Sequence, residues 1–297
     1  MLFKRQQLLL TLLETLQTPV GKTDFQKLLF LFTKEFETVP SYEFVPYRFG
    51  CFSFTASADH ARLVETGHLE KDEQQWRLTE AGRQVGRKFS ATLPQWRFKR
   101  RYEHLRGDAL IAQVYRNYPY YAIRSEIAAR VLSATEMRDL VGKAKPAFPG
   151  PGLLTIGYEG RSLEGYLNAL LQAGVTVLCD VRRNPLSRKY GFSKSTLSHA
   201  CAGVGLEYQH LPQLGIASEE RQELNCPADY DALFEVYERT TLPLQEQALT
   251  LIKNWIGTEN KRVALTCYER LPEQCHRHCV AEAVERAGGG SIKAIHL

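Results

Sequence analysis

Three short apolar runs, each followed at once by polar residues, decide the fold: Leu153-Leu-Thr-Ile-Gly-Tyr-Glu159, Val175-Thr-Val-Leu-Cys-Asp-Val-Arg182 and Arg262-Val-Ala-Leu-Thr-Cys-Tyr-Glu269. Helix-like segments separate these runs, and apolar strands that alternate with helices form a mainly parallel sheet covered on both faces. We predict strands at 153–156, 175–179 and 262–266, with helices at 162–173, 193–204 and 275–287. Residues 153–297 are therefore predicted to form an α/β domain.

Polar residues stand where these strands end. Gly157-Tyr-Glu-Gly160 follows the first strand, Asp180-Val-Arg-Arg-Asn-Pro185 the second, and Cys267-Tyr-Glu269 the third. Ligands of parallel sheets bind in the crevice outside the carboxyl ends of the strands. We therefore expect the three strand ends to converge on one crevice.

An ordered set of short motifs runs through this half: Thr155-Ile-Gly-Tyr158, Asp180-Val-Arg182, Asn184-Pro185, Gly191-Phe-Ser-Lys194, Tyr208-Gln-His210, Leu214-Gly215, Cys267-Tyr-Glu269 and Cys275-His-Arg277. With these motifs, residues 153–297 resemble the family called domain of unknown function 488. The resemblance implies a fold and a site, but the family's label names no reaction.

Three carboxylates are the candidate catalytic residues: Glu159, Asp180 and Glu269. A crevice carboxylate near another carboxylate can have a raised pKa and hold a proton near neutrality, as acid/base catalysis requires. The alternative for the glutamates is pairing with Arg182 or Arg183 to hold loops together. Asp180 is a candidate base, a nucleophile or a loop-capping acceptor of backbone N–H groups.

Cations and aromatic rings surround these carboxylates and favour an anionic ligand. Arginine can grip a phosphate with two parallel hydrogen bonds, and the first turn of a helix favours anions. The alternative is a set of surface ion pairs. The candidate ligand- and phosphate-binding residues are Tyr158, Arg182, Arg183, Arg188, Lys194, Tyr268, His276 and Arg277. We predict no cofactor.

The cysteines admit two further interpretations. Cys267, Cys275, His276 and Cys279 suggest zinc, but structural zinc pairs usually have Cys-x2–4-Cys spacing, whereas seven residues separate Cys267 from Cys275. We therefore predict no metal. The layout also resembles rhodanese-like enzymes, which would make Cys267 a nucleophilic thiol if nearby cations favoured the thiolate. A buried, inert Cys267 is the alternative.

Residues 1–90 are predicted to form a mostly α-helical, winged-helix-like domain. The segment Trp76-Arg-Leu-Thr-Glu-Ala-Gly-Arg83 resembles the end of a wing and the helix after it. Lys27-Leu-Leu-Phe30 and Tyr47-Arg-Phe-Gly50 resemble Panacea antitoxin-like domains. Such a domain binds nucleic acid or, alternatively, mediates dimerisation or docking of a partner protein.

A basic helical bridge and a proline- and glycine-rich linker are predicted over residues 91–152. Residues 1–151 carry 23 Lys and Arg against 16 Asp and Glu, and the remainder carries 15 against 17. A local basic excess points to a polyanion. The candidate nucleic-acid-binding residues are Arg97, Lys99, Arg100 and Arg101, which alternate with aromatic residues suited to stacking. The alternative is an amphipathic helix with a solvated basic face.

Together these features predict a nucleic-acid-associated enzyme that hydrolyses a sugar- or phosphate-linked bond, such as an N-glycosidic bond. DNA is the favoured partner. The alternatives are a non-catalytic sensor of a nucleotide or modified base, and a rhodanese-like thiol enzyme. No stretch of 18 to 20 uncharged apolar residues is present, so we expect no membrane partner. Seven cysteines without a disulfide-like pattern indicate a cytoplasmic protein. The oligomeric state stays open.

Overall fold

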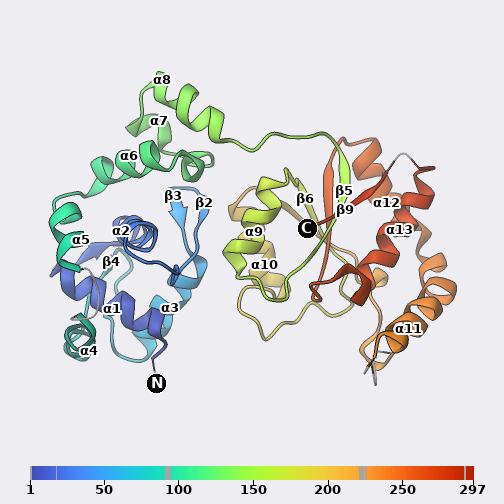
Figure 1. Cartoon of the computed structure of the whole chain (residues 1–297), viewed down its shortest axis with the longest axis horizontal. Helices are drawn as coiled ribbons and strands as arrows, with labels where there is room; N and C mark the ends of the chain where they lie inside the picture. The colour runs from blue at the N-terminus through green and yellow to red at the C-terminus, as the bar shows by residue number, and fades with distance from the viewer. Residues whose placement is uncertain (1, 18, 91–94, 221–223, 225, 291) are drawn as a thin grey trace. The chain divides into compact units, whose positions relative to one another are not determined.

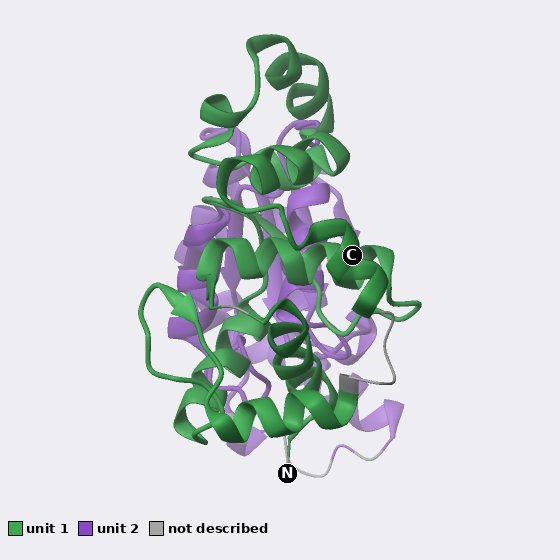
Figure 2. Ribbon diagram, turned by 90° about the vertical axis from the view of Figure 1, so that its left-hand side faces the viewer, with its two compact units in different colours: residues 1–145 green, residues 146–297 purple. Residues whose placement is uncertain are grey.

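The computed structural model describes every residue except 1, 18, 91–94, 221–223, 225 and 291. The chain divides into two compact units, residues 1–145 and 146–297 (Figure 1). Figure 2 distinguishes the two units by colour. The division falls inside the proline- and glycine-rich segment 143–152, and each unit buries its own set of apolar side chains.

Within its described residues, the second unit forms a five-stranded, all-parallel sheet with the strand order β7-β6-β8-β5-β9. This sheet confirms the predicted α/β fold. From residue 152 on, the elements are β5 (Gly152–Gly157), α9 (Leu163–Gln172), β6 (Val177–Asp180), α10 (Lys194–Gly203), β7 (Glu207–His210), η3 (Pro212–Leu214), η4 (Ser218–Glu220), α11 (Pro227–Thr240), η5 (Leu242–Gln245), α12 (Glu246–Gly257), β8 (Arg262–Cys267), η6 (Pro272–Gln274), α13 (Arg277–Ala287) and β9 (Ala294–His296).

Burial on both faces explains why the central strands are continuous apolar runs. Every residue of β8 is buried, and so is β5 from Leu153 onward. On one face, Leu153 and Val263 share a core with residues of α12 and α13. On the other face, Tyr166 of α9 donates a hydrogen bond to Thr266 at 2.7 Å. Figure 1 shows α9 and α10 on one side of the sheet and α12 and α13 on the other.

The order of the strands creates a crevice at β8. The chain leaves β5 and β6 through α9 and α10 on one face, whereas it leaves β8 through α13 on the opposite face (Figure 1). Because β8 lies between β6 and β5, the connections diverge on both of its sides. Such switch points are where open parallel sheets bind ligands.

The first unit is mostly helical, as predicted, with two small antiparallel strand pairs in its described residues, β1 with β4 and β2 with β3. Its elements are α1 (Lys4–Leu16), β1 (Val20–Gly21), α2 (Lys22–Glu35), β2 (Val45–Tyr47), β3 (Gly50–Phe52), α3 (Phe54–Glu65), β4 (Gln75–Trp76), α4 (Glu80–Ser90), α5 (Gln95–Tyr102), α6 (Gly107–Asn117), η1 (Pro119–Ala122), α7 (Ala128–Val131), α8 (Ala134–Glu136) and η2 (Met137–Gly142).

Contacts of the wing-like segment and of α5 tie both to the rest of this unit. Leu69 and Leu78 form an antiparallel bridge, the Glu70 N–H donates to the Arg77 carbonyl at 2.9 Å, and Trp76 pairs in addition with Val20 of β1. Residues 95–145 belong to the first compact unit. Phe98 of α5, for example, is fully buried and packs edge-on against Phe32 of α2 at 5.3 Å.

Close backbone packing in this unit yields a stability prediction. A Cβ placed on Gly82 of α4 would lie 2.1 Å from the carbonyl oxygen of His68. We expect Gly82→Ala to lower the free energy of unfolding by about 1–3 kcal/mol, because overpacking exceeds the gain in helix propensity. Gly257→Ala is the control, since nothing lies within 4 Å of a Cβ at that helical position. Urea unfolding followed by circular dichroism measures both, and an unchanged Gly82→Ala midpoint would contradict the packing argument.

Candidate functional site

The carboxyl ends of β5, β6 and β8 open into one crevice of about 340 Å³. Each of the three strand-end segments that sequence reasoning expected to converge contributes side chains to it, whereas the predicted catalytic residues Glu159 and Asp180 do not line it. The residues that line it are Tyr158, Arg182, Arg183, Asn184, Leu186, Ser187, Arg188, Ile216, Cys267, Tyr268 and Glu269. A carboxylate, a thiol, guanidinium groups and aromatic rings therefore share one opening.

A buried ion pair joins Asp180 at the end of β6 to Arg182. The two residues are 0% and 6% exposed. Arg182 donates from Nε to Asp180 Oδ1 at 2.8 Å and from Nη2 to Oδ2. Its backbone N–H and the hydroxyl of Tyr208 donate to the same carboxylate at 3.1 and 2.6 Å. Burial, followed by the negative charge of Asp180, raises the pKa of Tyr208 and keeps that hydroxyl a donor. This environment favours Asp180 as the acceptor that orients Arg182.

Arg182 in turn supports an aromatic wall of the crevice. Its Nη1 donates to the hydroxyl of Tyr158 and to the carbonyl of Phe192, both at 2.9 Å. The Tyr158 ring stacks on Phe192 with centroids 4.3 Å apart. Tyr268 meets Tyr158 edge-on at 5.3 Å and is 46% exposed. Tyr268 is therefore the ring of this wall that is most open to a ligand.

The loop after β8 is held from two sides. A Cβ on Gly157 would lie 1.8 Å from the carbonyl oxygen of Glu269, so only glycine allows the loop to approach β5 this closely. Arg277, which is 1% exposed, donates to the carbonyl oxygens of Glu269 and Arg270. Glu159 accepts a hydrogen bond from the backbone N–H of Arg270 at 2.9 Å. Glu159 and Arg277, a predicted catalytic and a predicted phosphate-binding residue, therefore both bind this loop.

Cys267, Cys275 and His276 meet beneath the crevice and are all buried. One Sγ or ring nitrogen from each residue lies within 4.8 Å of the others. His276 Nε2 donates to the backbone carbonyl of Val181 at 3.1 Å, and Cys267 Sγ donates to Glu269 Oε2 at 3.3 Å. All seven cysteines lie among the described residues, and none forms a disulfide.

A sequence comparison identifies the family of this region. Residues 162–284 match the family described as Domain of unknown function DUF488. The second unit carries a DUF488 domain. This result confirms the family resemblance of the second unit over residues 162–284. No curated protein and no solved structure matches the chain. Among the described residues, no helix has the length and apolar composition needed to cross a bilayer.

The remaining predicted cations of the DUF488 domain differ in their placement. Arg183 and Arg188 are exposed and line the crevice. Lys194 is exposed at the start of α10, where its Nζ lies 3.1 Å from His210 Nδ1, and it does not line the crevice. Lys189, which sequence reasoning did not select, donates to the Tyr158 carbonyl at 2.9 Å, and burial lowers its pKa. The rim cations open to a ligand are thus the two arginines.

Sequence reasoning missed two residues that shape the DUF488 crevice. Tyr208 and Phe192 occur in the family-like motifs but received no role. The register of β6 and β7 pairs Leu178 with Tyr208, and side chains two residues apart in a strand share a face. Tyr208 therefore lies on the same face as Asp180. That register was not available from the sequence.

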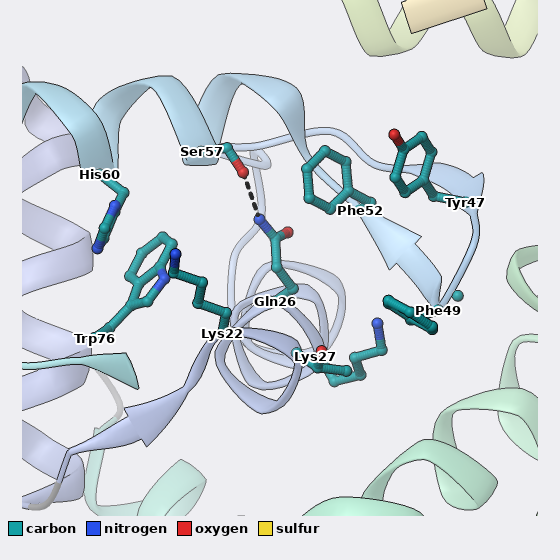
Figure 3. Close-up of a pocket in the computed structure, with 11 residues that line it drawn as sticks. Lys22, Gln26, Lys27, Tyr47, Phe49, Phe52, Ser57, His60 and Trp76 are labelled. Carbon is teal, nitrogen blue, oxygen red and sulfur yellow. Dashed lines mark hydrogen bonds between the residues drawn. The ribbon is translucent and has the colours of Figure 1, made fainter. Parts of the chain in front are cut away.

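A second pocket, of about 440 Å³, lies in the first unit (Figure 3). Tyr47 stacks on Phe52 at 4.7 Å toward one end, and His60 packs on Trp76 at 4.3 Å toward the other (Figure 3). Lys27 is buried with its Nζ donating to the Cys51 carbonyl at 3.2 Å, and burial lowers its pKa. The lining residues are Lys22, Thr23, Gln26, Lys27, Tyr47, Phe49, Gly50, Phe52, Ser57, His60 and Trp76. These residues come from separate segments of the chain, so no single sequence motif predicted this pocket.

The predicted nucleic-acid-binding residues lie on α5. Trp96 is 64% exposed, and the guanidinium carbon of Arg97 lies 5.1 Å from the centroid of its ring. Arg97 and Arg100 are exposed. Lys99 donates to Gln17 at 2.9 Å, and Arg101 forms an ion pair with Glu35 at 3.3 Å. Arg97 and Arg100 are therefore the better placed of the four cations for phosphate contacts.

The buried ion pair gives a prediction about Asp180. We expect Asp180→Asn to lower the free energy of unfolding by about 3–5 kcal/mol, because it leaves the Arg182 guanidinium buried without its counter-charge. Asp231→Asn, the same change at an exposed position of α11, should stay within about 0.5 kcal/mol of the parent protein. Urea unfolding checks both, and an Asp180→Asn protein of full stability would argue against a structural role for the pair.

Proposed function

We propose that the DUF488 crevice hydrolyses a sugar- or phosphate-linked bond in nucleic acid or a nucleotide. N-glycosidic cleavage of a base is the reaction that its side chains suit best. The observation that carries the proposal is the joint lining of one crevice by Glu269, the exposed ring of Tyr268 and the exposed cations Arg183 and Arg188. A carboxylate, a stacking surface and phosphate-binding groups are what such a reaction needs.

Glu269 is the acid/base residue in this proposal, because it alone of the three candidate carboxylates lines the crevice. It would activate water or stabilise positive charge that develops on the sugar. Asp180 and Glu159 act indirectly. Asp180 orients Arg182, and Glu159 holds the loop that carries Glu269 through its bond to Arg270.

The other lining residues would position the substrate. Arg183 and Arg188 would bind phosphate oxygens at the rim, because guanidinium groups bind such anions with paired hydrogen bonds. Tyr268 would stack on a base or sugar. Arg182 would contribute positive charge from the wall, where Asp180 and Tyr158 fix its orientation.

The first unit would bind the polyanion, with DNA favoured. Its support is the exposed pair of Trp96 and Arg97 on α5 together with the nearby Arg100. Aromatic rings and cations combine in many surfaces that bind nucleic acid, because the rings stack on bases and the cations displace counterions. Cysteines without disulfides fit a cytoplasmic location for this activity.

A sensor is the second candidate function. Of the three candidate carboxylates, only Glu269 lines the crevice. Because two of the three predicted catalytic groups are absent from the lining, the structure supports ligand binding without catalysis more strongly than the sequence did. The crevice would then bind a nucleotide or modified base without turnover. A thiol enzyme gains less support, because Cys267 is 1% exposed and its Sγ lies beside the carboxylate of Glu269, whose negative charge opposes a thiolate.

Release of a small product tests the proposed hydrolysis. The purified protein is incubated with plain and naturally modified DNA and RNA, and mass spectrometry detects free base, sugar or nucleotide. We expect Glu269→Gln to reduce the release rate by about 10²–10⁴-fold, the usual contribution of a positioned acid or base. Glu273→Gln, an exposed position of the same loop, should retain the rate.

Two outcomes would count against hydrolysis. Binding of the nucleic acid without any released product would favour the sensor. Full activity of Glu269→Gln on a substrate that the parent protein cleaves would show that another group performs the chemistry.

The α5 surface makes a separate prediction about salt dependence. Replacing Arg97 and Arg100 with Ala should flatten the plot of log K against log salt by roughly 0.9 per lost phosphate contact on duplex DNA. Arg62→Ala is the control, because Arg62 pairs with Glu65 on α3 at 2.9 Å. Fluorescence anisotropy at several salt concentrations gives the slopes, and equal slopes for the parent and the α5 variant would remove this surface from the binding site.

A further inference from the structure

The fold brings together three side chains that are good ligands for a soft or borderline metal ion. Cys267 ends β8, Cys275 follows η6, and His276 caps α13. Each offers one ligand atom, and these atoms lie within 4.8 Å of one another. All three residues are at most 1% exposed. The seven-residue gap between Cys267 and Cys275 led us to predict no metal. In the structure, however, the loop 268–274 folds so that the two cysteines lie close together.

The orientation of His276 supplies an independent observation. Its Nε2 lies 3.1 Å from the carbonyl of Val181, an acceptor, so the neutral ring carries its proton on Nε2. The lone pair of Nδ1 is then directed toward Cys267 Sγ at 3.8 Å and Cys275 Sγ at 4.0 Å. Metal-binding histidines almost always donate their other ring N–H to a carbonyl or carboxylate in this way.

The distances are close to those of a tetrahedral zinc centre. Bonds of about 2.1 Å to nitrogen and 2.3 Å to sulfur place the two ligand atoms about 3.6 Å apart. The two observed nitrogen–sulfur distances exceed this by a few tenths of an ångström. The loop is also held independently of any ion, because Arg277 binds its carbonyls and Gly157 permits its close approach.

We propose that Cys267, Cys275 and His276 bind a zinc ion, with the remaining coordination position directed to the crevice beside Glu269. Two thiolates and an imidazole favour zinc over the hard cations magnesium and calcium. Cys267 and Glu269 both line the crevice, so the open position would be accessible to a water or ligand. Three protein ligands and an open position characterise catalytic zinc rather than structural zinc.

The test measures metal in the full-length protein, purified under reducing conditions without a histidine tag. Elemental mass spectrometry should find about one zinc per chain. After removal of zinc by a chelator, added Co²⁺ should produce a thiolate-to-metal absorption band and the visible bands of a tetrahedral site. Cobalt reports on the ligands of the parent protein directly, so the result does not depend on whether any variant folds.

Matched variants locate the ion. Cys275→Ser and His276→Asn should lose the zinc and the cobalt band, whereas Cys279→Ser and His278→Asn should retain both. The control pair lies in the first turn of α13, just after His276, and is also a contacting Cys–His pair, with Sγ and Nε2 3.4 Å apart. Circular dichroism verifies that each variant is folded. If the buried variants do not fold, the cobalt spectrum of the parent protein alone shows whether thiolates bind the ion.

Several outcomes would overturn the proposal. One is a reduced parent protein that holds neither zinc nor cobalt. Another is a purified protein in which Cys267 and Cys275 form a disulfide, and whose thiols bind neither zinc nor cobalt after reduction. Loss of metal in the control pair alone would place the ion elsewhere. Hydrolysis is assayed on the same preparations, so zinc without activity would remove the proposed reaction and leave the metal site standing.

Discussion

The buried ion pair between Asp180 and Arg182 is the interaction on which the crevice depends. Through Asp180 it ties the end of β6 to Tyr208 of β7, and through Arg182 it reaches Tyr158 after β5. Removing two charges from water is costly unless hydrogen bonds satisfy them, and here both groups are heavily engaged. The pair therefore links β5, β6 and β7 at this edge of the sheet. The aromatic wall and the guanidinium charge of the crevice follow from it.

The second constraint is the loop that follows β8. The carbonyl oxygen of Glu269 packs closely against Gly157. The same oxygen accepts a hydrogen bond from Arg277 in the first turn of α13. An arginine used in this way stabilises a backbone conformation rather than a ligand. The loop thereby presents the Glu269 side chain to the crevice and returns Cys275 and His276 to the end of β8.

The sequence predicted the architecture of the second unit because alternating apolar strands and helices leave few alternatives. It also predicted that the segments beginning at Gly157, Asp180 and Cys267 converge on one crevice, because the carboxyl ends of parallel strands meet at the same edge of a sheet. It could not assign roles to these groups. Whether Asp180 faces a ligand or Arg182 depends on the register of β6 and β7 and on a side-chain rotamer, and neither is encoded in a local pattern.

The same limit applies to the cysteines and to α5. Linear spacing between Cys267 and Cys275 says little about their separation once an intervening loop folds back. In α5, the alternation of aromatic and basic residues fits both a binding surface and a packed helix. The structure shows both at once, since Phe98 is buried in the core and Trp96 is exposed beside Arg97.

The proposed zinc ion would change the catalytic role that Glu269 has in the proposed reaction. Without a metal, the proposed reaction would require Glu269 either to activate water or to stabilise a sugar cation unaided. A zinc ion lowers the pKa of a bound water toward neutrality. Glu269 would then need only to accept and return a proton close to that water, and the reaction could extend to displacement of an amino group from a base, which requires an activated water rather than a cation stabiliser. In the proposed reaction, the bond that breaks would thus depend on whether Cys267, Cys275 and His276 hold an ion.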